Sequence, residues 1–213
     1  MKILSQNPIF SASLLLLLLQ VSNASAADQT SDSNQTIMNS NQTNLDYIKT
    51  SCNATLYQTL CYSCLYPYAS LIDSDPEKLA ITALNLTLSE TKSTQRLVKF
   101  ISRRRHASLG PGEAAAVKDC LEEMSDSVYE LKDSIAEMKA INYSSFEMVV
   151  SDVQTWVSAA LTDQVTCMDG FEEAGGGKTE VKELVRKHID RVTRMTSNAL
   201  AFINLYASTV LQN

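Results

Sequence analysis

The sequence predicts an all-α protein: an up-down-up-down four-helix bundle, preceded by a short helical hairpin and held by two disulfides. From residue 74 onward, apolar side chains recur at alternating steps of three and four residues, the period of one helix face. Glycine and proline fall at short connections between these stretches, and no period-two alternation typical of strands persists. The chain has five cysteines in 213 residues, which is enough for the two disulfides.

The first 26 residues predict a secretory signal peptide. Met1-Lys2 precedes an apolar stretch from Ile9 to Leu19, and the small residues Ala24-Ser25-Ala26 follow. A membrane anchor is the alternative, but a span needs about 20 apolar residues, and Gln20 and Ser22 interrupt this run. We therefore expect cleavage after Ala26, secretion, and no membrane association of the mature chain.

Two short regions follow before the bundle. Residues 27–44 consist mainly of Ser, Asn, Gln, Thr and Asp, with little apolar surface to offset the entropy of ordering, so we expect a flexible leader. Ordered structure is expected from Leu45, in a domain that runs to residue 213. Residues 45–70, which include Cys52, Cys61 and Cys64, are too short for a bundle helix and predict a helical hairpin.

The bundle is expected over residues 74–211. Its first helix should begin at Ser74-Asp75-Pro76-Glu77, where Ser74 or Asp75 can cap and Pro76 suits the first turn, and should run to about Arg105. The second should follow Gly110-Pro111. Its apolar stripe comprises Val117, Leu121, Met124, Val128, Leu131, Ile135 and Met138.

The third and fourth helices show the same alternating spacing of apolar residues by three and four positions. A capping box at Ser144 and Glu147 predicts the start of the third, and Gly175, Gly176 and Gly177 form the next turn. The third stripe comprises Phe146, Val150, Val153, Val157, Leu161, Val165 and Met168. The fourth comprises Val181, Val185, His188, Val192, Met195, Ala199, Phe202 and Tyr206.

The cysteine spacing favours a specific pairing. Cys52 and Cys61 lie nine residues apart, so a tight hairpin would bring them together. Antiparallel neighbours place the start of one helix beside the end of the next, which favours a second bond between Cys120 and Cys167. Cys64 is left as a buried free thiol or as a site of intermolecular pairing.

The net charge of the chain limits the kinds of partner that it can bind. A formal net charge of -6 and a pI near 5.0 argue against nucleic acid and anionic membranes, and favour a basic partner. Cysteines in a secreted chain indicate an oxidising compartment. Glycosylation sequons occur at Asn34, Asn41, Asn53, Asn85 and Asn142.

We find no constellation of residues that indicates catalysis, a metal or a cofactor. His106 and His188 have no partners at metal-ligand spacing. The acid pairs Glu122-Glu123 and Glu172-Glu173 are adjacent on helices, where neighbouring side chains point apart, and are expected to be solvated. The chain is therefore not expected to be an enzyme.

Two strings resemble the plant invertase and pectin methylesterase inhibitor family. The first is Cys52-Asn53-Ala54-Thr55-Leu56-Tyr57 leading to Cys61. The second is Thr155-Trp156-Val157-Ser158-Ala159-Ala160-Leu161-Thr162 leading to Thr166-Cys167-Met168-Asp169-Gly170-Phe171. The resemblance covers Leu45 to the C-terminus. It implies a four-helix bundle after a helical hairpin, with the first two and last two bridge cysteines paired.

The resemblance also implies a target. The branch that inhibits invertase is associated with a Pro-Lys-Phe tripeptide, which this chain lacks, and the Ser-Ala-Ala-Leu-Thr string is similar to the pectin methylesterase branch. It implies an extracellular inhibitor in the apoplast or cell wall that binds one esterase across its pectin cleft. The implied contact residues are Glu122, Asp126, Tyr129, Thr166 and Asp169; the family can have an acid where this chain has Tyr129.

Two other functions stay open from the sequence. An invertase inhibitor would share the fold and differ in target. A carrier bundle would open its core to an apolar ligand, although the regular Val and Leu stripes argue for a filled core.

Overall fold

The computed structural model describes residues 28–104, 108–142, 144–174 and 179–211. The expected signal peptide therefore lies outside it. Every regular element in these ranges is a helix, which confirms the all-α prediction. The chain divides into two compact units, Met1–Gln42 and Thr43–Asn213, and helix α1 (Asp28–Asn53) contributes residues to both.

Helix α1 begins inside the stretch for which we expected a flexible leader, so the structure differs from that expectation over 28–44. The stretch is polar, but it contains neither glycine nor proline to stop a helix. Extending an existing helix also costs less than nucleating one. Within the second unit, Asn44 and Ile48 are buried, and Asn44 Oδ1 accepts a hydrogen bond from Ser74 Oγ at 2.7 Å.

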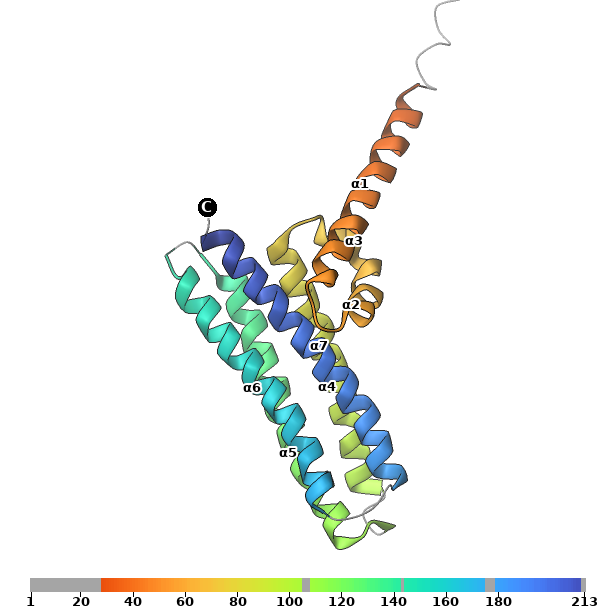
Figure 1. Cartoon of the computed structure of the whole chain (residues 1–213), viewed down its shortest axis with the longest axis vertical. Coiled ribbons are helices and arrows are strands. Elements are labelled where there is room, and N and C mark those ends of the chain that lie inside the picture. The colour runs from red at the N-terminus through yellow and green to blue at the C-terminus, as the bar shows by residue number, and fades with distance from the viewer. Residues whose placement is uncertain (1–27, 105–107, 143, 175–178, 212–213) are drawn as a thin grey trace, which may run out of the picture. The chain divides into compact units, whose positions relative to one another are not determined.

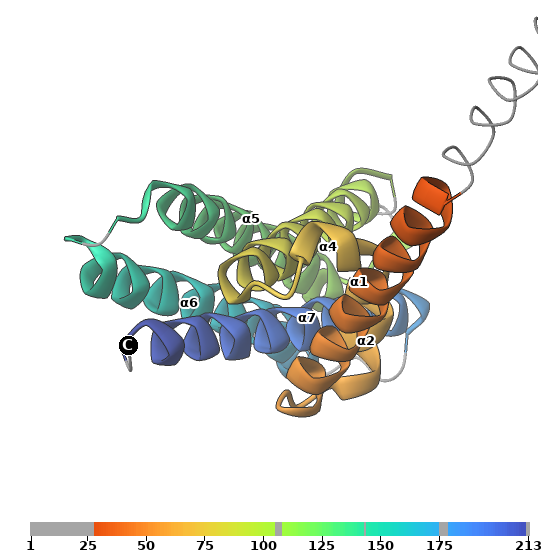
Figure 2. The same cartoon turned by 90° about the horizontal axis from the view of Figure 1, so that it is seen from above.

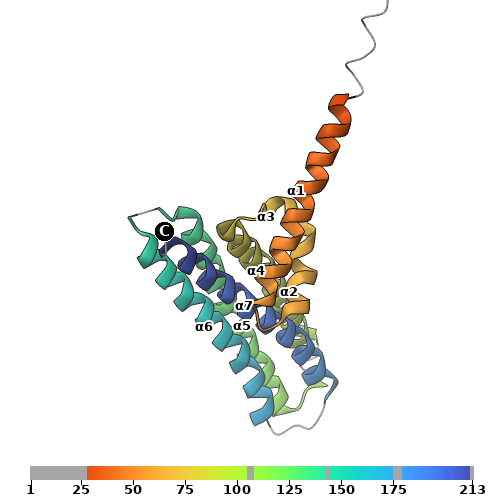
Figure 3. The same cartoon turned by 45° about the horizontal axis from the view of Figure 1, so that its top comes forward.

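The hairpin follows as α2 (Gln58–Leu65), the 3-10 turn η1 (Tyr66–Tyr68) and α3 (Ala69–Ile72). The Cys52–Cys61 disulfide forms as predicted, with the Cα atoms 5.6 Å apart. Asn198 on the last helix accepts from Tyr57 N at 3.2 Å and donates to Tyr57 O at 3.1 Å. These two bonds fix the hairpin turn to the bundle, and Figure 3 shows α2 beside the bundle.

Four long helices form the bundle: α4 (Pro76–Arg104), α5 (Pro111–Ala140), α6 (Phe146–Glu173) and α7 (Glu180–Leu211). Each packs against two neighbours, α4 against α5 and α7, and α6 against α5 and α7 (Figure 2). The end of α5, the start of α6 and the end of α7 lie at one end of the bundle (Figure 1). This is the predicted up-down-up-down arrangement.

The helix starts confirm one predicted cap and correct another. Asp75 Oδ1 accepts from Lys78 N at 2.8 Å, with Pro76 in the first turn of α4, as expected. The capping box at the start of α6 does not form, because Ser145 is the N-cap and its side chain makes no capping bond. Asn142 Oδ1 instead accepts from the backbone N–H groups of Ser144 and Ser145.

The core consists of two apolar clusters separated by a buried polar level. The larger cluster uses α4 up to Leu84 and α7 from Ala199 onward, whereas the smaller uses α4 from Val98 and α7 up to Ile189. Between them, polar side chains from all four helices are fully buried: Thr91, Thr94, Ser127, Gln164 and Thr196. The side chains of Thr91, Ser127, Gln164 and Thr196 have hydrogen-bond partners, whereas Thr94 Oγ1 has none. Such a level restricts the register in which the helices can pack, because a buried polar group is stabilised by a partner.

Candidate functional site

The α5–α6 pair carries all five residues of the expected contact surface, so its geometry determines how that surface is built. The predicted Cys120–Cys167 disulfide joins the two helices, with both cysteines buried and the Cα atoms 4.1 Å apart. Two turns further along α5, Ser127 Oγ donates to Ala160 O at 3.2 Å. These two links fix the antiparallel register of α5 against α6.

A buried polar network extends this register to α7. Gln164 is fully buried; its Nε2 donates to Ser127 Oγ at 2.8 Å, and its Oε1 accepts from Thr196 Oγ1 at 2.9 Å. The neighbouring Val165 was expected to point inward, and this prediction is wrong because Val165 is exposed in the structure. The stripe shifts by one residue there because Gln164 satisfies both of its polar groups inside the bundle, so its burial is not penalised.

The five expected contact residues are all exposed. Tyr129 on α5 is 66% exposed, which is high for an aromatic side chain. Glu122 pairs with Lys118 at 3.5 Å, an exposed contact that contributes little to stability. Thr166 and Asp169 lie on α6, in the turn that contains Cys167, and Thr166 Oγ1 donates to Thr162 O at 3.0 Å. We call Glu122, Asp126, Tyr129, Thr166 and Asp169 the α5–α6 face.

An acidic cluster adjoins this face, and sequence reasoning missed it. Glu123 and Glu130 of α5 and Asp163 of α6 influence one another electrostatically, and Asp126 of the face acts on all three. Desolvation is the largest cause of the raised pKa of each; for Glu130 the pKa rises to about 8. Glu123, Asp126 and Glu130 are spaced three and four residues apart, so the shared helix face was available as a signal.

Glu130 and Asp163 form a carboxyl pair across the two helices. Burial is the largest cause of the raised pKa of both groups, and their mutual interaction raises the pKa of Glu130 further, so the pair retains a proton above the usual pH range of a carboxyl. Ionising both carboxyls would place two like charges together in a partly desolvated site, which is unfavourable. The charge beside the α5–α6 face therefore depends on pH.

At the C-terminal end of α6, three residues beyond Asp169, the structure corrects the expectation that Glu172 is merely solvated. Glu172 accepts from Lys182 Nζ at 2.7 Å and from Arg186 Nη2 at 2.6 Å. The hydrogen bond from Lys182 is the largest cause of the lowered pKa of Glu172. Lys182 is buried, so the pair fixes the end of α6 to the start of α7.

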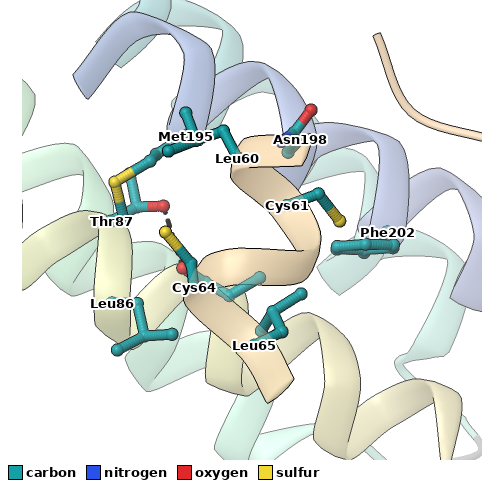
Figure 4. Close-up of a pocket in the computed structure, with 10 residues that line it drawn as sticks. Leu60, Cys61, Cys64, Leu65, Leu86, Thr87, Met195, Asn198 and Phe202 are labelled. Carbon is teal, nitrogen blue, oxygen red and sulfur yellow. Dashed lines mark hydrogen bonds between the residues drawn. The ribbon is translucent and has the colours of Figure 1, made fainter. Parts of the chain in front are cut away.

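The free thiol lies away from this face, in the hairpin. Cys64 is partly exposed and unpaired, and Arg191 Nη2 lies 3.8 Å from its sulfur. Figure 4 shows it pointing toward Thr87, at a cavity bounded also by Met195 and Phe202. The cavity volume is about 20 Å³. That volume is of the order of one water molecule, so this cavity does not accommodate the apolar ligand that a carrier would need.

Metal sites and membrane-spanning helices are both absent from the described part of the chain. Among these residues, no group of three or more His, Cys, Asp or Glu side chains is arranged to hold a metal ion. His188 is half-buried, while His106 lies outside the described ranges. None of the described helices is long and apolar enough to cross a membrane.

Comparison with known proteins identifies the fold and the family. A family model described as plant invertase/pectin methylesterase inhibitor matches residues 46–202. Pectinesterase inhibitor 10 of Arabidopsis thaliana is 61% identical over 173 residues, which cover 80% of this chain and 54% of that protein. The 21 kDa protein of Daucus carota is 39% identical over 212 residues, 98% of each chain.

Solved structures support the same fold. The crystal structure of mutant form A of a pectin methylesterase inhibitor from Arabidopsis matches with a TM-score of 0.60 at 19% identity, covering 74% of this chain and 95% of that one. The family model and Pectinesterase inhibitor 10 are named for inhibitors, in agreement with the expectation that the chain is not an enzyme. The residues matched by the family model, the identity to the curated relatives and the shared fold lead to one conclusion: the chain belongs to the plant invertase/pectin methylesterase inhibitor family.

Proposed function

We propose that this protein is a secreted inhibitor of pectin methylesterase that binds the enzyme one-to-one and covers its pectin cleft with the α5–α6 face. The observation that carries the proposal is the 61% identity to Pectinesterase inhibitor 10 over 173 residues. The chain spans 54% of the length of that relative.

The α5–α6 face has the chemistry of a protein-binding surface. It combines the exposed aromatic ring of Tyr129 with the carboxylates of Glu122, Asp126 and Asp169. Tyrosine is enriched among residues that dominate binding energy, and complementary charge accelerates encounter with a basic partner. The disulfide and the Gln164 network hold both helices in place, so little entropy is lost when the face is covered.

Extracellular action is part of the proposal. The expected signal peptide over 1–26 and the two disulfides favour an oxidising compartment such as the apoplast or cell wall. Invertase is the alternative target, because the family model is named for both enzymes. The absence of a Pro-Lys-Phe tripeptide favours pectin methylesterase.

The direct test titrates the purified mature protein against plant pectin methylesterases and, in parallel, against cell-wall and vacuolar invertases. We expect stoichiometric loss of methanol release from pectin with unchanged sucrose hydrolysis. Inhibition of invertase alone would overturn the assigned target, and a two-to-one end point would overturn the proposed stoichiometry.

The α5–α6 face is tested by a matched pair of substitutions on one helix. Asp169→Asn removes a charge from the face, whereas Asp152→Asn removes the same charge from an exposed position 17 residues earlier on α6. We expect Asp169→Asn to slow association and weaken its salt dependence, with Asp152→Asn close to wild type. Tyr129→Ala should weaken binding by about tenfold, equivalent to about 1.4 kcal/mol. Equal effects of the two Asp substitutions would exclude the face.

A further inference from the structure

The structure distinguishes between sequons that the sequence alone treats as equal. In the unit Thr43–Asn213, the described residues include both the asparagine and the hydroxyl residue of three sequons: Asn53 with Thr55, Asn85 with Thr87, and Asn142 with Ser144. An N-linked glycan is bulky and is attached to asparagines in surface loops of secreted proteins. All three asparagines are exposed, so the three sequons are separated by their position relative to the helices and by the bonds of the hydroxyl residue.

Asn142 lies outside the helices, after the last residue of α5 and before the first of α6. Both Asn142 and Ser144 are exposed. Asn142 Oδ1 accepts from Ser144 N at 3.1 Å and from Ser144 Oγ at 2.7 Å. These bonds use the oxygen of the side-chain amide, so the turn does not depend on the nitrogen, which is the atom that a glycan would modify.

The other two sequons are built into helical structure. Asn85 lies within α4, and its Nδ2 donates to Ile81 O at 2.7 Å. Thr87 is 1% exposed, and its hydroxyl donates to Ala83 O at 2.8 Å. A sequon is modified before or while the chain folds, so the local conformation it favours matters most. Residues 85–87 favour a helix, in which the Asn85 side chain and the Thr87 hydroxyl bond to separate backbone carbonyls and not to each other.

Asn53 is similarly constrained by its hydroxyl partner. It is the last residue of α1 and directly follows the bridged Cys52. Thr55 is 5% exposed, and its Oγ1 donates to Cys52 O at 2.9 Å beside the disulfide. The hydroxyl is therefore held inside the turn that the bridge closes.

We propose that Asn142 carries an N-linked glycan, and that Asn53 and Asn85 remain unmodified. The proposal rests on the proposed secretion of the chain. In the transfer, a bond forms between Asn142 Nδ2 and C1 of a sugar carried on a lipid pyrophosphate. The bond between C1 and the phosphate oxygen breaks, the pyrophosphate stays with the lipid, and Nδ2 loses one proton.

A glycan at Asn142 has a structural consequence for partner binding. Tyr129 is 11 residues before the last residue of α5, which corresponds to about 17 Å at the rise of a helix, and Asn142 lies two residues beyond that end. The sugar would therefore leave the α5–α6 face uncovered. It would shield the end of the bundle where α5, α6 and α7 meet (Figure 1), and so exclude docking at that end.

The test uses the full-length chain expressed in plant cells and collected from the secreted fraction. Peptides are mapped by mass spectrometry before and after enzymatic removal of N-glycans, which converts each modified asparagine to aspartate. We expect conversion at Asn142 and none at Asn53 or Asn85. An unmodified Asn142 in secreted material overturns the proposal, as does conversion at Asn53 or Asn85 to a similar extent.

Two variants of the hydroxyl residue separate glycan loss from misfolding. Ser144→Ala abolishes the sequon and Ser144→Thr preserves it, while both keep Asn142. We expect the mass of one glycan to disappear only in Ser144→Ala, with the Cys120–Cys167 bond intact in both. Occupancy is read without any esterase, so failure of this proposal and failure of the proposed inhibition are distinguishable.

Discussion

The bundle contains two helix pairs that are held together by different means. The α5–α6 pair has a disulfide, a buried glutamine network and, at its edge, a carboxyl pair that resists full ionisation. The α4–α7 pair has no covalent link among its described residues. It is joined by apolar packing, by the Arg191–Glu90 ion pair at 3.3 Å and by the bond from Tyr206 to Glu77 at 3.2 Å.

This difference relates stability to the proposed function. The helices that carry the exposed face are the ones whose register is fixed most strongly, and the helices that mainly supply core are fixed by packing. A preorganised surface loses less entropy on binding than one that must first be ordered. Rigidity is thus concentrated where the proposed partner would bind.

Removal of the Cys120–Cys167 bond should cause the largest loss in the free energy of unfolding. The bond closes a separation of 47 residues, so the loop-entropy estimate for replacing both cysteines by alanine is about 4 kcal/mol. Removal of Cys52–Cys61, with a separation of 9, should cost about 3 kcal/mol. Denaturant unfolding of the two double variants measures both, and a larger loss from the hairpin bond would reverse our ranking.

Loss of the buried network should have the next largest effect. Gln164→Ala leaves a cavity and removes bonds to Ser127 and Thr196, so we expect a loss of about 3 kcal/mol in the free energy of unfolding. Gln154→Ala is the control, because Gln154 lies on the same helix and bonds Asn204 in an exposed position at 2.8 Å. Its cost should stay below about 1 kcal/mol. If the two variants lost the same free energy of unfolding, the buried polar level would contribute no more to stability than an exposed hydrogen bond.

The sequence predicted most of the fold because the signals that define it are local. Periodicity located the four long helices, and cysteine spacing identified both disulfides. The stretch 28–44 expected as a leader lies in α1, because composition measures apolar burial and not the ease of extending a helix. Val165 was placed inward because the burial of Gln164 depends on Ser127 and Thr196, which lie far away in the sequence.

The candidate site was less predictable than the fold. The exposure of Glu122, Asp126, Tyr129, Thr166 and Asp169 agrees with a contact surface, but their role stays a prediction. The Glu130–Asp163 pair could not be found from adjacent acids, because its two members come from different helices whose register the disulfide sets. The spacing of residues along one helix predicts which of them share a face. The residues of other helices that contact this face depend on tertiary packing and cannot be predicted from that spacing.

The carboxyl pair makes the α5–α6 contribution to stability depend on pH. The pKa of Glu130 is raised from 4.5 to about 8, so the folded state binds this proton more tightly than the unfolded state. The resulting stability is fully present below pH 4.5 and is lost as the pH rises toward 8. Asp163, Glu123 and Asp126 are the acids that act on Glu130.

We expect Glu130→Gln to flatten this pH dependence. After allowance for solvent screening, the wild type should lose about 1 to 2 kcal/mol over this interval, and the variant less. Unfolding midpoints measured at several pH values test the slope. Glu147→Gln, which changes an exposed acid elsewhere on α6, should leave the slope unchanged. A wild type that gains stability over the same interval would contradict the raised pKa.

The smallest loss of stability is expected from a substitution between α4 and α7. Burial, followed by the charge of Glu77, raises the pKa of Tyr206 to about 12, so its hydroxyl remains a donor at any physiological pH. Tyr206→Phe keeps the ring, which packs edge-on against Phe146, and should cost about 0.5 to 1 kcal/mol. Tyr129→Phe provides the exposed comparison, with a change near zero. A loss from Tyr206→Phe as large as that from Gln164→Ala would mean that both pairs depend on specific polar contacts. A small loss means that α4 and α7 are held by apolar packing, which constrains their register less strictly than a buried hydrogen bond does.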